Sequence, residues 1–433
     1  MKLRLSLLAG AAASVVLASG HCAEAASPAP RESAAEAERQ AAEIETLKAQ
    51  VQALTERLAA QEQRQQALER QAAEADAAAK VAQAKAAAQI ETIPAQVKTA
   101  VAEQAPKPDW TSATKVSGRM YFDLSHVDVE RDGANVAPSG TGFDIKRFYV
   151  GVDHRFDDTF SANVTTDVQY NDAEGLTQVY IKKAYLQAKV ADALTVRLGS
   201  ADLPWVPFAE DVYGYRFVEN TVADRDKFGT SADWGVHAFG KLGMVDYAVS
   251  AINGAGYKSP TRSKSVDFEG RLSTTVDHFT FGVGGYTGKL GKDKQGVVTY
   301  HRAERLDAIA AYRTDRFRVG AEYFAARNWN NVTTVAGDKS DGYSLFGSFN
   351  ITPQVAAFGR YDRVRTARDT VPGRKDSYFN LGLNYEPAKI VDLALVYKRD
   401  KVDNGLISTS NGAIGGVAGG TYDEVGLFGQ FRW

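Results

Sequence analysis

FSANVTTDVQY, residues 160–170, alternates strictly between two kinds of side chain. Its even-numbered residues are apolar, aromatic or threonine, and its odd-numbered residues, from Ser161 to Gln169, are all polar. A period of two residues places successive side chains on opposite faces of a β-strand. The stretch therefore predicts a strand with one apolar and one polar face.

The same period recurs from Val116 to the end of the chain. It predicts sixteen strands, near residues 115–128, 143–155, 160–170, 179–190, 194–200, 233–240, 245–253, 265–276, 279–288, 304–313, 317–327, 342–351, 355–365, 377–386, 391–401 and 423–433.

The connections between these segments alternate in length. Some are short turns, such as Asp157-Asp158 and Asp277-His278. The others are long polar loops, near 129–142, 171–178, 201–232, 254–264, 289–303, 328–341, 366–376 and 402–422. An even strand number with this alternation is typical of an outer-membrane β-barrel. A soluble β-sandwich or propeller is the alternative, but its apolar face lies in a core, which requires no such alternation.

The last strand supports the barrel. Val425, Leu427, Phe431 and Trp433 fall on one face, and the final residue is aromatic. This resembles the C-terminal signal by which the barrel-assembly machinery recognises bacterial outer-membrane barrels, with Leu427, Phe431 and Trp433 as its residues. The fold class we predict is an all-β transmembrane barrel of about 16 antiparallel strands, preceded by a short α-helical coiled coil.

Composition excludes other classes. The chain has 433 residues, 24% of them charged, and a formal net charge of −2. After the first twenty residues no apolar run approaches the roughly 20 residues that a spanning helix needs, which excludes a polytopic helical membrane protein. With no excess of basic residues, we expect no nucleic-acid partner.

The first residues have the order of a secretory signal peptide. Charged Lys2 and Arg4 precede an apolar stretch, and Ala23-Glu24-Ala25 supplies small residues at a cleavage site. We assign residues 1–25 to this peptide. The alternative is a lipid anchor on Cys22, the one cysteine, but His21 stands where a lipobox requires a small residue. Cleavage after Ala25 leaves a mature chain without thiols, and so without disulfides or cysteine metal sites.

Residues 26–93 are rich in Ala, Gln and Glu and carry apolar residues at alternating spacings of three and four. They begin at Ile44, Leu47, Val51, Leu54 and Leu58. This spacing predicts a periplasmic coiled coil that joins subunits, and a solvated, partly helical spacer is the alternative. Residues 94–111 contain prolines and form a linker, and residues 112–433 form the barrel.

The third long loop carries the candidate pore residues. Sixteen strands leave room for an aqueous channel, and the loop near 201–232 is unusually aromatic for a hydrated segment. Rigid rings and prolines suit a loop that narrows a lumen. An aromatic plug against the barrel wall is the alternative. The candidate residues of this constriction loop are Trp205, Phe208, Tyr213, Tyr215, Arg216, Arg225 and Lys227.

The run Leu194-Thr195-Val196-Arg197-Leu198-Gly199, leading to Pro204, Pro207-Phe208 and Glu210, resembles the strand-to-constriction-loop passage of the phosphate-selective porin O and P family. Segments 146–152 and 183–186 are similar to that family's second and fourth strands. The resemblance covers residues 112–433. It implies a trimeric 16-stranded outer-membrane channel for small anions, with basic residues along the route.

The charge pattern limits this resemblance. Residues 202–227 contain three basic and six acidic side chains, and the barrel as a whole is neutral. The better candidates for an anion ladder are Lys146, Arg119, Arg147 and Arg197. Alternation places the three arginines on the polar face, so these three are the candidate pore-lining cations. A second basic cluster comprises Arg360, Arg363, Arg365, Arg368, Arg374 and Lys375. We interpret it as a surface that binds lipopolysaccharide phosphates rather than as an anion ladder.

The function that we predict is passive diffusion of small hydrophilic solutes, with anions or phosphate preferred, through a homotrimeric porin in the bacterial outer membrane. Its N-terminal segment would lie in the periplasm. The alternative is a channel for sugars or carboxylates that stack on the aromatic loop. An outer-membrane enzyme is a further alternative, but no histidine has a spacing that suggests metal ligation or a nucleophile partner. We expect no cofactor and no metal.

Overall fold

The computed structural model describes residues 110–171 and 176–433, together with scattered helical positions between 41 and 81. The chain divides into two compact units, residues 1–105 and 106–433. The predicted signal peptide, residues 94–109 of the linker and most of the coiled coil lie outside the described residues. Within the first unit, Lys48 forms an ion pair of 2.8 Å with Glu45 one helical turn before it. No helix among the described residues is long and apolar enough to cross a membrane.

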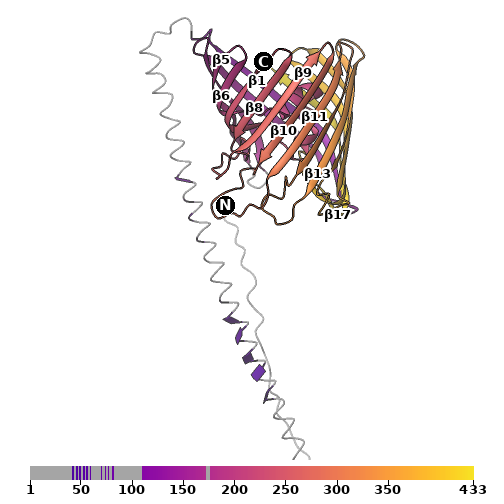
Figure 1. The fold of residues 1–433 in the computed structure, drawn as a ribbon. Coiled ribbons are helices and arrows are strands. Elements are labelled where there is room, and N and C mark those ends of the chain that lie inside the picture. The colour runs from indigo at the N-terminus through magenta and orange to yellow at the C-terminus, as the bar shows by residue number, and fades with distance from the viewer. Residues whose placement is uncertain are drawn as a thin grey trace, which may run out of the picture. The chain divides into compact units, whose positions relative to one another are not determined.

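The second unit is a closed antiparallel barrel of sixteen long strands (Figure 1). The strands are β1 (Thr114–Arg131), β3 (Gly140–Arg155), β4 (Phe160–Asn171), β5 (Leu176–Ala191), β6 (Leu194–Asp202), β7 (Ala232–Leu242), β8 (Val245–Ile252), β9 (Asp267–Val276), β10 (Phe279–Gly288), β11 (Ala303–Arg313), β12 (Phe317–Arg327), β13 (Lys339–Asn350), β14 (Val355–Arg365), β15 (Lys375–Ala388), β16 (Val391–Thr409) and β17 (Gly412–Arg432).

Each strand pairs with its neighbour in the chain, and β1 closes the ring because it pairs with both β3 and β17. A two-residue strand, β2 (Ala134–Asn135), folds back on the end of β1. Two short helices, α2 (Val206–Tyr213) and α3 (Val222–Arg225), lie in the long loop between β6 and β7. The sixteen-strand prediction is confirmed, and short turns alternate with longer connections as expected.

The largest difference between the predicted and the observed strands lies near the end of the chain. The prediction of a loop over residues 402–422 is wrong, because β16 and β17 continue into it as a hairpin that turns at Ser410-Asn411. Ile407 pairs with Ile414 in this extension. Gly, Ala and Ser fill much of the segment, and such small residues conceal a two-residue period that depends on apolar contrast.

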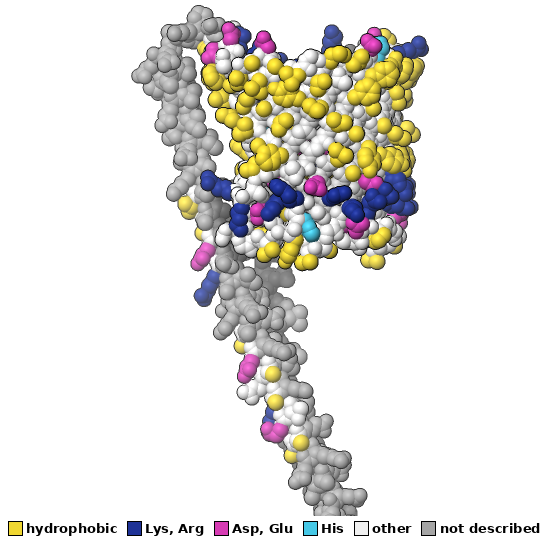
Figure 2. All heavy atoms as spheres, in the orientation of Figure 1, with side chains coloured by type: hydrophobic (Ala, Val, Ile, Leu, Met, Phe, Trp, Pro, Cys, Tyr) yellow, Lys and Arg dark blue, Asp and Glu magenta, His cyan; other side chains and the backbone are white. Residues whose placement is uncertain are grey.

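The outer wall is apolar. Figure 2 shows hydrophobic side chains over the barrel surface and, near the edge formed by the longer loops, a band of Lys and Arg. Aromatic side chains gather at both ends of the wall, as expected for a barrel that spans a lipid bilayer. Near the short turns, the Phe279 and Tyr312 rings are 4.7 Å apart. Toward the long loops, the Tyr343 and Tyr361 rings are 6.2 Å apart.

The C-terminal strand has the expected face. Val425 and Leu427 are exposed on the outer wall, and the Phe431 and Trp433 rings stack with centroids 5.5 Å apart. The Trp433 ring lies over Gly118 of β1, where a Cβ would come 1.8 Å from the ring. The use of these residues as an assembly signal stays a prediction.

Candidate functional site

The loop between β6 and β7, residues 203–231, folds into the barrel; we call it the constriction loop. Its position matches the predicted loop at 201–232. Pro207 lies in the first turn of α2, where its missing N–H needs no partner, and Gly214 ends this helix with a φ of 70°. Arg305 of β11 donates to the carbonyl of Phe228, and Arg360 of β14 donates to the carbonyl of Asn220. The loop is therefore fastened to the strands opposite its own hairpin.

Trp205 holds the start of α2 against the wall. Its side chain is fully buried, its backbone N–H donates to Glu269 Oε1 at 2.9 Å, and its indole N–H donates to Glu322 Oε1 at 2.8 Å. The ring occupies space left by Gly284 of β10, where a Cβ would lie 2.5 Å from the ring. Phe208 lies over Gly282 of the same strand in the same way.

The other two aromatic candidates also pack on the wall. The Tyr213 ring stacks on Phe346 with centroids 4.0 Å apart, and the Tyr215 ring stacks on Phe358 at 4.2 Å. Trp205 is 0% exposed and Tyr213 is 6% exposed. These two rings therefore have no open face for a solute. They pack against the barrel wall, as in the alternative of an aromatic plug.

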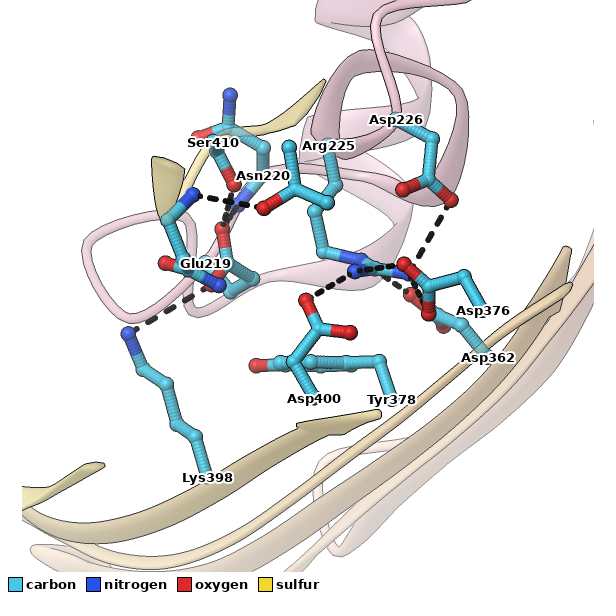
Figure 3. Close-up of polar contacts among 12 residues, drawn as sticks. Glu219, Asn220, Arg225, Asp226, Asp362, Asp376, Tyr378, Lys398, Asp400 and Ser410 are labelled. Atoms are coloured by element: carbon cyan, nitrogen blue, oxygen red, sulfur yellow. Dashed lines mark hydrogen bonds and ion pairs between the residues drawn. The ribbon is translucent and has the colours of Figure 1, made fainter. Parts of the chain in front are cut away.

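Arg225 fastens the second half of the loop. Its guanidinium donates to Asp362, Asp376 and Asp400, at 3.2, 3.1 and 2.7 Å. These carboxylates come from three consecutive strands, β14, β15 and β16 (Figure 3). Its neighbour Asp226 accepts from the same guanidinium at 3.2 Å. Because Arg225 is completely buried among these groups, its side chain anchors the constriction loop to the barrel wall and presents no charge to the lumen.

A second anchor lies beside the first (Figure 3). Lys398 of β16 pairs with Glu219 of the loop at 3.6 Å and with Glu424 of β17 at 3.0 Å. Burial raises the pKa of Glu219, but Lys398 and then Lys146 outweigh it and hold that pKa below its usual range. The loop carboxylate therefore stays ionised, which keeps the ion pair with Lys398.

With the loop fastened to strands β9–β16, the open lumen lies against β1 and β3–β6. A cavity of about 690 Å³ remains there. It is lined by seven basic side chains, Arg119, Lys182, Lys183, Arg197, Arg216, Lys389 and Arg432, and by four carboxylates, Asp153, Asp202, Glu210 and Asp211. Although the barrel is neutral, this opening is lined by more cations than anions. The basic wall is defined here as Arg119, Lys182, Lys183 and Arg197.

Several cations of the opening are held without a carboxylate. Arg119 donates to Tyr121 at 3.3 Å, and Lys182 donates to Tyr149 at 3.2 Å. Arg197 lies between the rings of Tyr185 and Phe239, 4.6 Å from each, and donates to Gln187. In the part of the chain that the structure describes, none of these three cations forms an ion pair. Their charge therefore remains available to a solute.

Two β-bulges turn toward the lumen cations that a strict two-residue alternation would place on the outer face. In the β1–β3 ladder Tyr121 pairs with Arg147 and Phe122 with Ile145, so Lys146 is an extra residue. In the β4–β5 ladder Lys182 is extra between Lys183 and Ile181. A bulge turns two consecutive side chains toward one face. Arg147 pairs with Asp167 at 3.7 Å, Lys146 with Asp123 at 3.6 Å and Lys183 with Asp202 at 2.5 Å.

The remaining candidates have different surroundings. Arg216 lines the opening and pairs with Glu210 at 2.5 Å. Lys227 is exposed, and its carbonyl accepts from the indole of Trp329 at 2.8 Å. The predicted surface cluster that included Arg360 is wrong for that residue, because alternation turns Arg360 inward, where it is 8% exposed. The described residues contain no group of His, Cys, Asp or Glu side chains that could hold a metal ion.

Comparison with known proteins agrees with this geometry. A family model described as Gram-negative porin matches residues 72–405. An anion-selective porin from Comamonas acidovorans superimposes with a TM-score of 0.56 at 12% identity, covering 74% of this chain and 99% of that one. The trimer form of the Vibrio cholerae outer-membrane protein OmpT gives 0.52 at 12% identity, with coverages of 74% and 99%. OmpF of Salmonella typhi, in complex with daunomycin, gives 0.51 at 13%, with coverages of 74% and 97%. These identities bear on the fold alone. No curated protein is significantly similar in sequence.

Proposed function

The chain belongs to the Gram-negative porin family, and from this premise we propose that its outer-membrane channel prefers small anions. The observation that carries the proposal is the charge of the opening, where seven basic side chains face four carboxylates. Three of the cations, Arg119, Lys182 and Arg197, have aromatic or neutral partners. An anion in this opening gains charge-assisted hydrogen bonds that a cation cannot make.

Inorganic phosphate is the anion that the resemblance to the phosphate-selective porin O and P family suggests. The family match supports a Gram-negative porin in general. A phosphate dianion requires several converging donors. Lys182 and Lys183 are consecutive residues in the lining of the opening, and Arg216 of the constriction loop also lines it. This arrangement is compatible with a phosphate route.

The test is electrical. In planar bilayers with a KCl gradient, we expect a reversal potential of the sign that chloride permeation gives, and a cation-selective sign would end the proposal. Liposome swelling with phosphate, a disaccharide and a dicarboxylate then ranks the solutes. If the disaccharide blocks the current at low concentration, the channel is the sugar-specific alternative instead. The buried faces of Trp205 and Tyr213 argue against that outcome.

For the assembly we propose a homotrimer, which a trimeric structural neighbour supports. We also propose a cleaved signal peptide at residues 1–25 and a periplasmic coiled coil at residues 26–93 before the linker at 94–111. Chemical crosslinking of the mature chain, with and without residues 26–93, separates barrel-driven from stalk-driven trimerisation. Neither the family nor the neighbours support the enzyme alternative.

A further inference from the structure

The lipid-facing wall contains a groove of about 760 Å³ that the channel does not use. Its origin lies in the register of β10–β13. One row across the four strands is Phe281, Ala310, Ala321 and Leu345, and the next row is Val283, Ala308, Tyr323 and Tyr343. The small alanines at the centre of these rows, between large side chains at the edges, leave a groove on the outer surface. We call it the outer groove.

Cations stand at the end of the outer groove that faces the long loops. The second row beyond Tyr323 contains Arg327 of β12 paired with Lys339 of β13. On β14, Arg363 and Arg365 lie at the same end of the outward face. We call these four residues the outer basic row. At about 3.3 Å per residue, Arg327 lies about 13 Å along its strand from Tyr323.

The outer basic row carries more positive than negative charge. The acidic residues on the outward faces beside it are Glu304 and Asp341. Arg365 is already paired with Asp341 at 2.5 Å, and Lys339 lies 3.7 Å from Asp369. Among the described residues, Arg327 and Arg363 form no ion pair with a carboxylate. Four cations on three neighbouring strands, about 5 Å apart from strand to strand, therefore face the headgroup region.

We propose that the outer groove and the outer basic row together bind one lipopolysaccharide molecule, with an acyl chain in the groove and its phosphates on the cations. The proposal rests on the outer-membrane orientation of the barrel, in which long loops lie outside, and not on the solute. The two parts suit one lipid because the aromatic rim of Tyr323 and Tyr343 lies between them, at the depth where interfacial aromatic residues reside. A second protein copy would fit poorly, since the surface is concave and its end is cationic.

The experiment measures binding of bisphosphorylated lipid A to the purified full-length barrel in detergent. The row variant is Arg327→Gln/Lys339→Gln/Arg363→Gln, and its control is Arg316→Gln at the other end of β12. A cation near a lipid surface contributes about a fivefold change in affinity, from about 1 kcal/mol each. We expect the triple variant to lose about a hundredfold, the control to bind normally, and dephosphorylated lipid A to bind the unaltered barrel weakly.

The groove is tested separately with Ala310→Phe/Ala321→Phe, which fills its floor. The control is Leu395→Phe on β16, whose cross-strand neighbours Leu383 and Leu427 leave no groove. We expect the filled variant to lose affinity at least tenfold, and a normal affinity would overturn the groove assignment. Equal binding of dephosphorylated lipid A would overturn the role of the outer basic row. Inter-copy disulfide formation by Ala310→Cys in the membrane would overturn the groove assignment, because a second copy would then occupy the outer groove.

Single-channel conductance is recorded for every variant, because all of these side chains face away from the lumen. We expect unchanged conductance and selectivity. If the unaltered barrel conducts normally but does not bind lipid A, the lipid site is refuted and the proposed function is not. Normal lipid binding with a cation-selective current refutes the proposed function alone.

Discussion

Arg225 Nη1 lies 2.7 Å from Asp400 Oδ2, and this contact joins the constriction loop to strand β16 across 175 residues of sequence. The same guanidinium also contacts the carboxylates of β14 and β15. One arginine thus fixes the loop to three strands, while the loop's first half is held by Trp205 on β9 and β12. The width of the opening depends on both anchors.

We expect Arg225→Ala to release the second half of the loop. Removing one partner of a buried ion pair costs about 3–5 kcal/mol because the remaining charges stay buried without compensation. Four carboxylates would be left facing one another. In bilayers the variant should show larger and noisier single-channel currents, and in solution its loop should be cut faster by protease.

The matched control is Lys227→Ala, since Lys227 lies on the same loop but its side chain is exposed. It should conduct like the unaltered protein. If Arg225→Ala and Lys227→Ala give the same quiet current, the anchor does not set the size of the opening.

The basic wall should set ion selectivity. A unit charge about 4 Å from an ion in water contributes about 1 kcal/mol, which is about a fivefold change in permeability at low salt. We therefore expect Arg119→Gln/Arg197→Gln to lower the anion-to-cation permeability ratio by at least that factor, measured as a reversal potential in a KCl gradient. Lys241→Gln, at an exposed turn, is the control. An unchanged potential in the double variant would show that other charges control selectivity.

Much of the barrel could be predicted from the sequence, because lipid outside and water inside impose opposite chemistry on alternate residues. The stretch 160–170 shows this pattern clearly, and β4 begins at Phe160 as predicted. The β16–β17 extension could not be predicted, since Gly and Ala do not contrast with Ser and Thr. The structure pairs these residues through their backbones, which a side-chain pattern does not report.

The site was harder to predict than the fold. Arg119 and Arg197, which alternation places on the polar face, line the opening. Alternation cannot anticipate a β-bulge, so it gave no sign of Lys182 and no reason for Lys146 to point inward. Residue type alone also made Arg225 look like a pore cation. Its role follows only from the carboxylates of three strands, which are distant in sequence and meet in the closed barrel.

Gly284 provides a steric test of the first anchor. A Cβ at this position would lie 2.5 Å from the Trp205 ring, so Gly284→Val should push the indole away from Glu322. Trp205→Phe removes the same indole hydrogen bond without adding volume, and it should cost about 1–3 kcal/mol because a buried acceptor loses its donor.

Thermal unfolding compares the Gly284→Val and Trp205→Phe variants. Gly285→Ala is the control, since the nearest atom to its added Cβ is 3.5 Å away. Equal stability of Gly284→Val and the control would show that the ring can move freely.

The carboxylate cluster around Arg225 should make the loop sensitive to alkaline pH. Burial raises the pKa of Asp226 well above its usual value, Arg225 opposes this, and Asp376 and Asp400 raise it again. A carboxyl with a raised pKa binds its proton more tightly in the folded state, so its contribution to stability falls as the pH rises above about 4, the ordinary pKa of Asp. The loss of stability approaches about 1.4 kcal/mol per pH unit until the folded pKa is reached.

We therefore expect noisier currents at pH 9 than at pH 5, and a quiet current at both pH values for Asp226→Asn, which keeps the neutral form. Asp369→Asn, in a different loop, should keep the pH dependence of the unaltered channel. If Asp226→Asn keeps it as well, another group controls the loop.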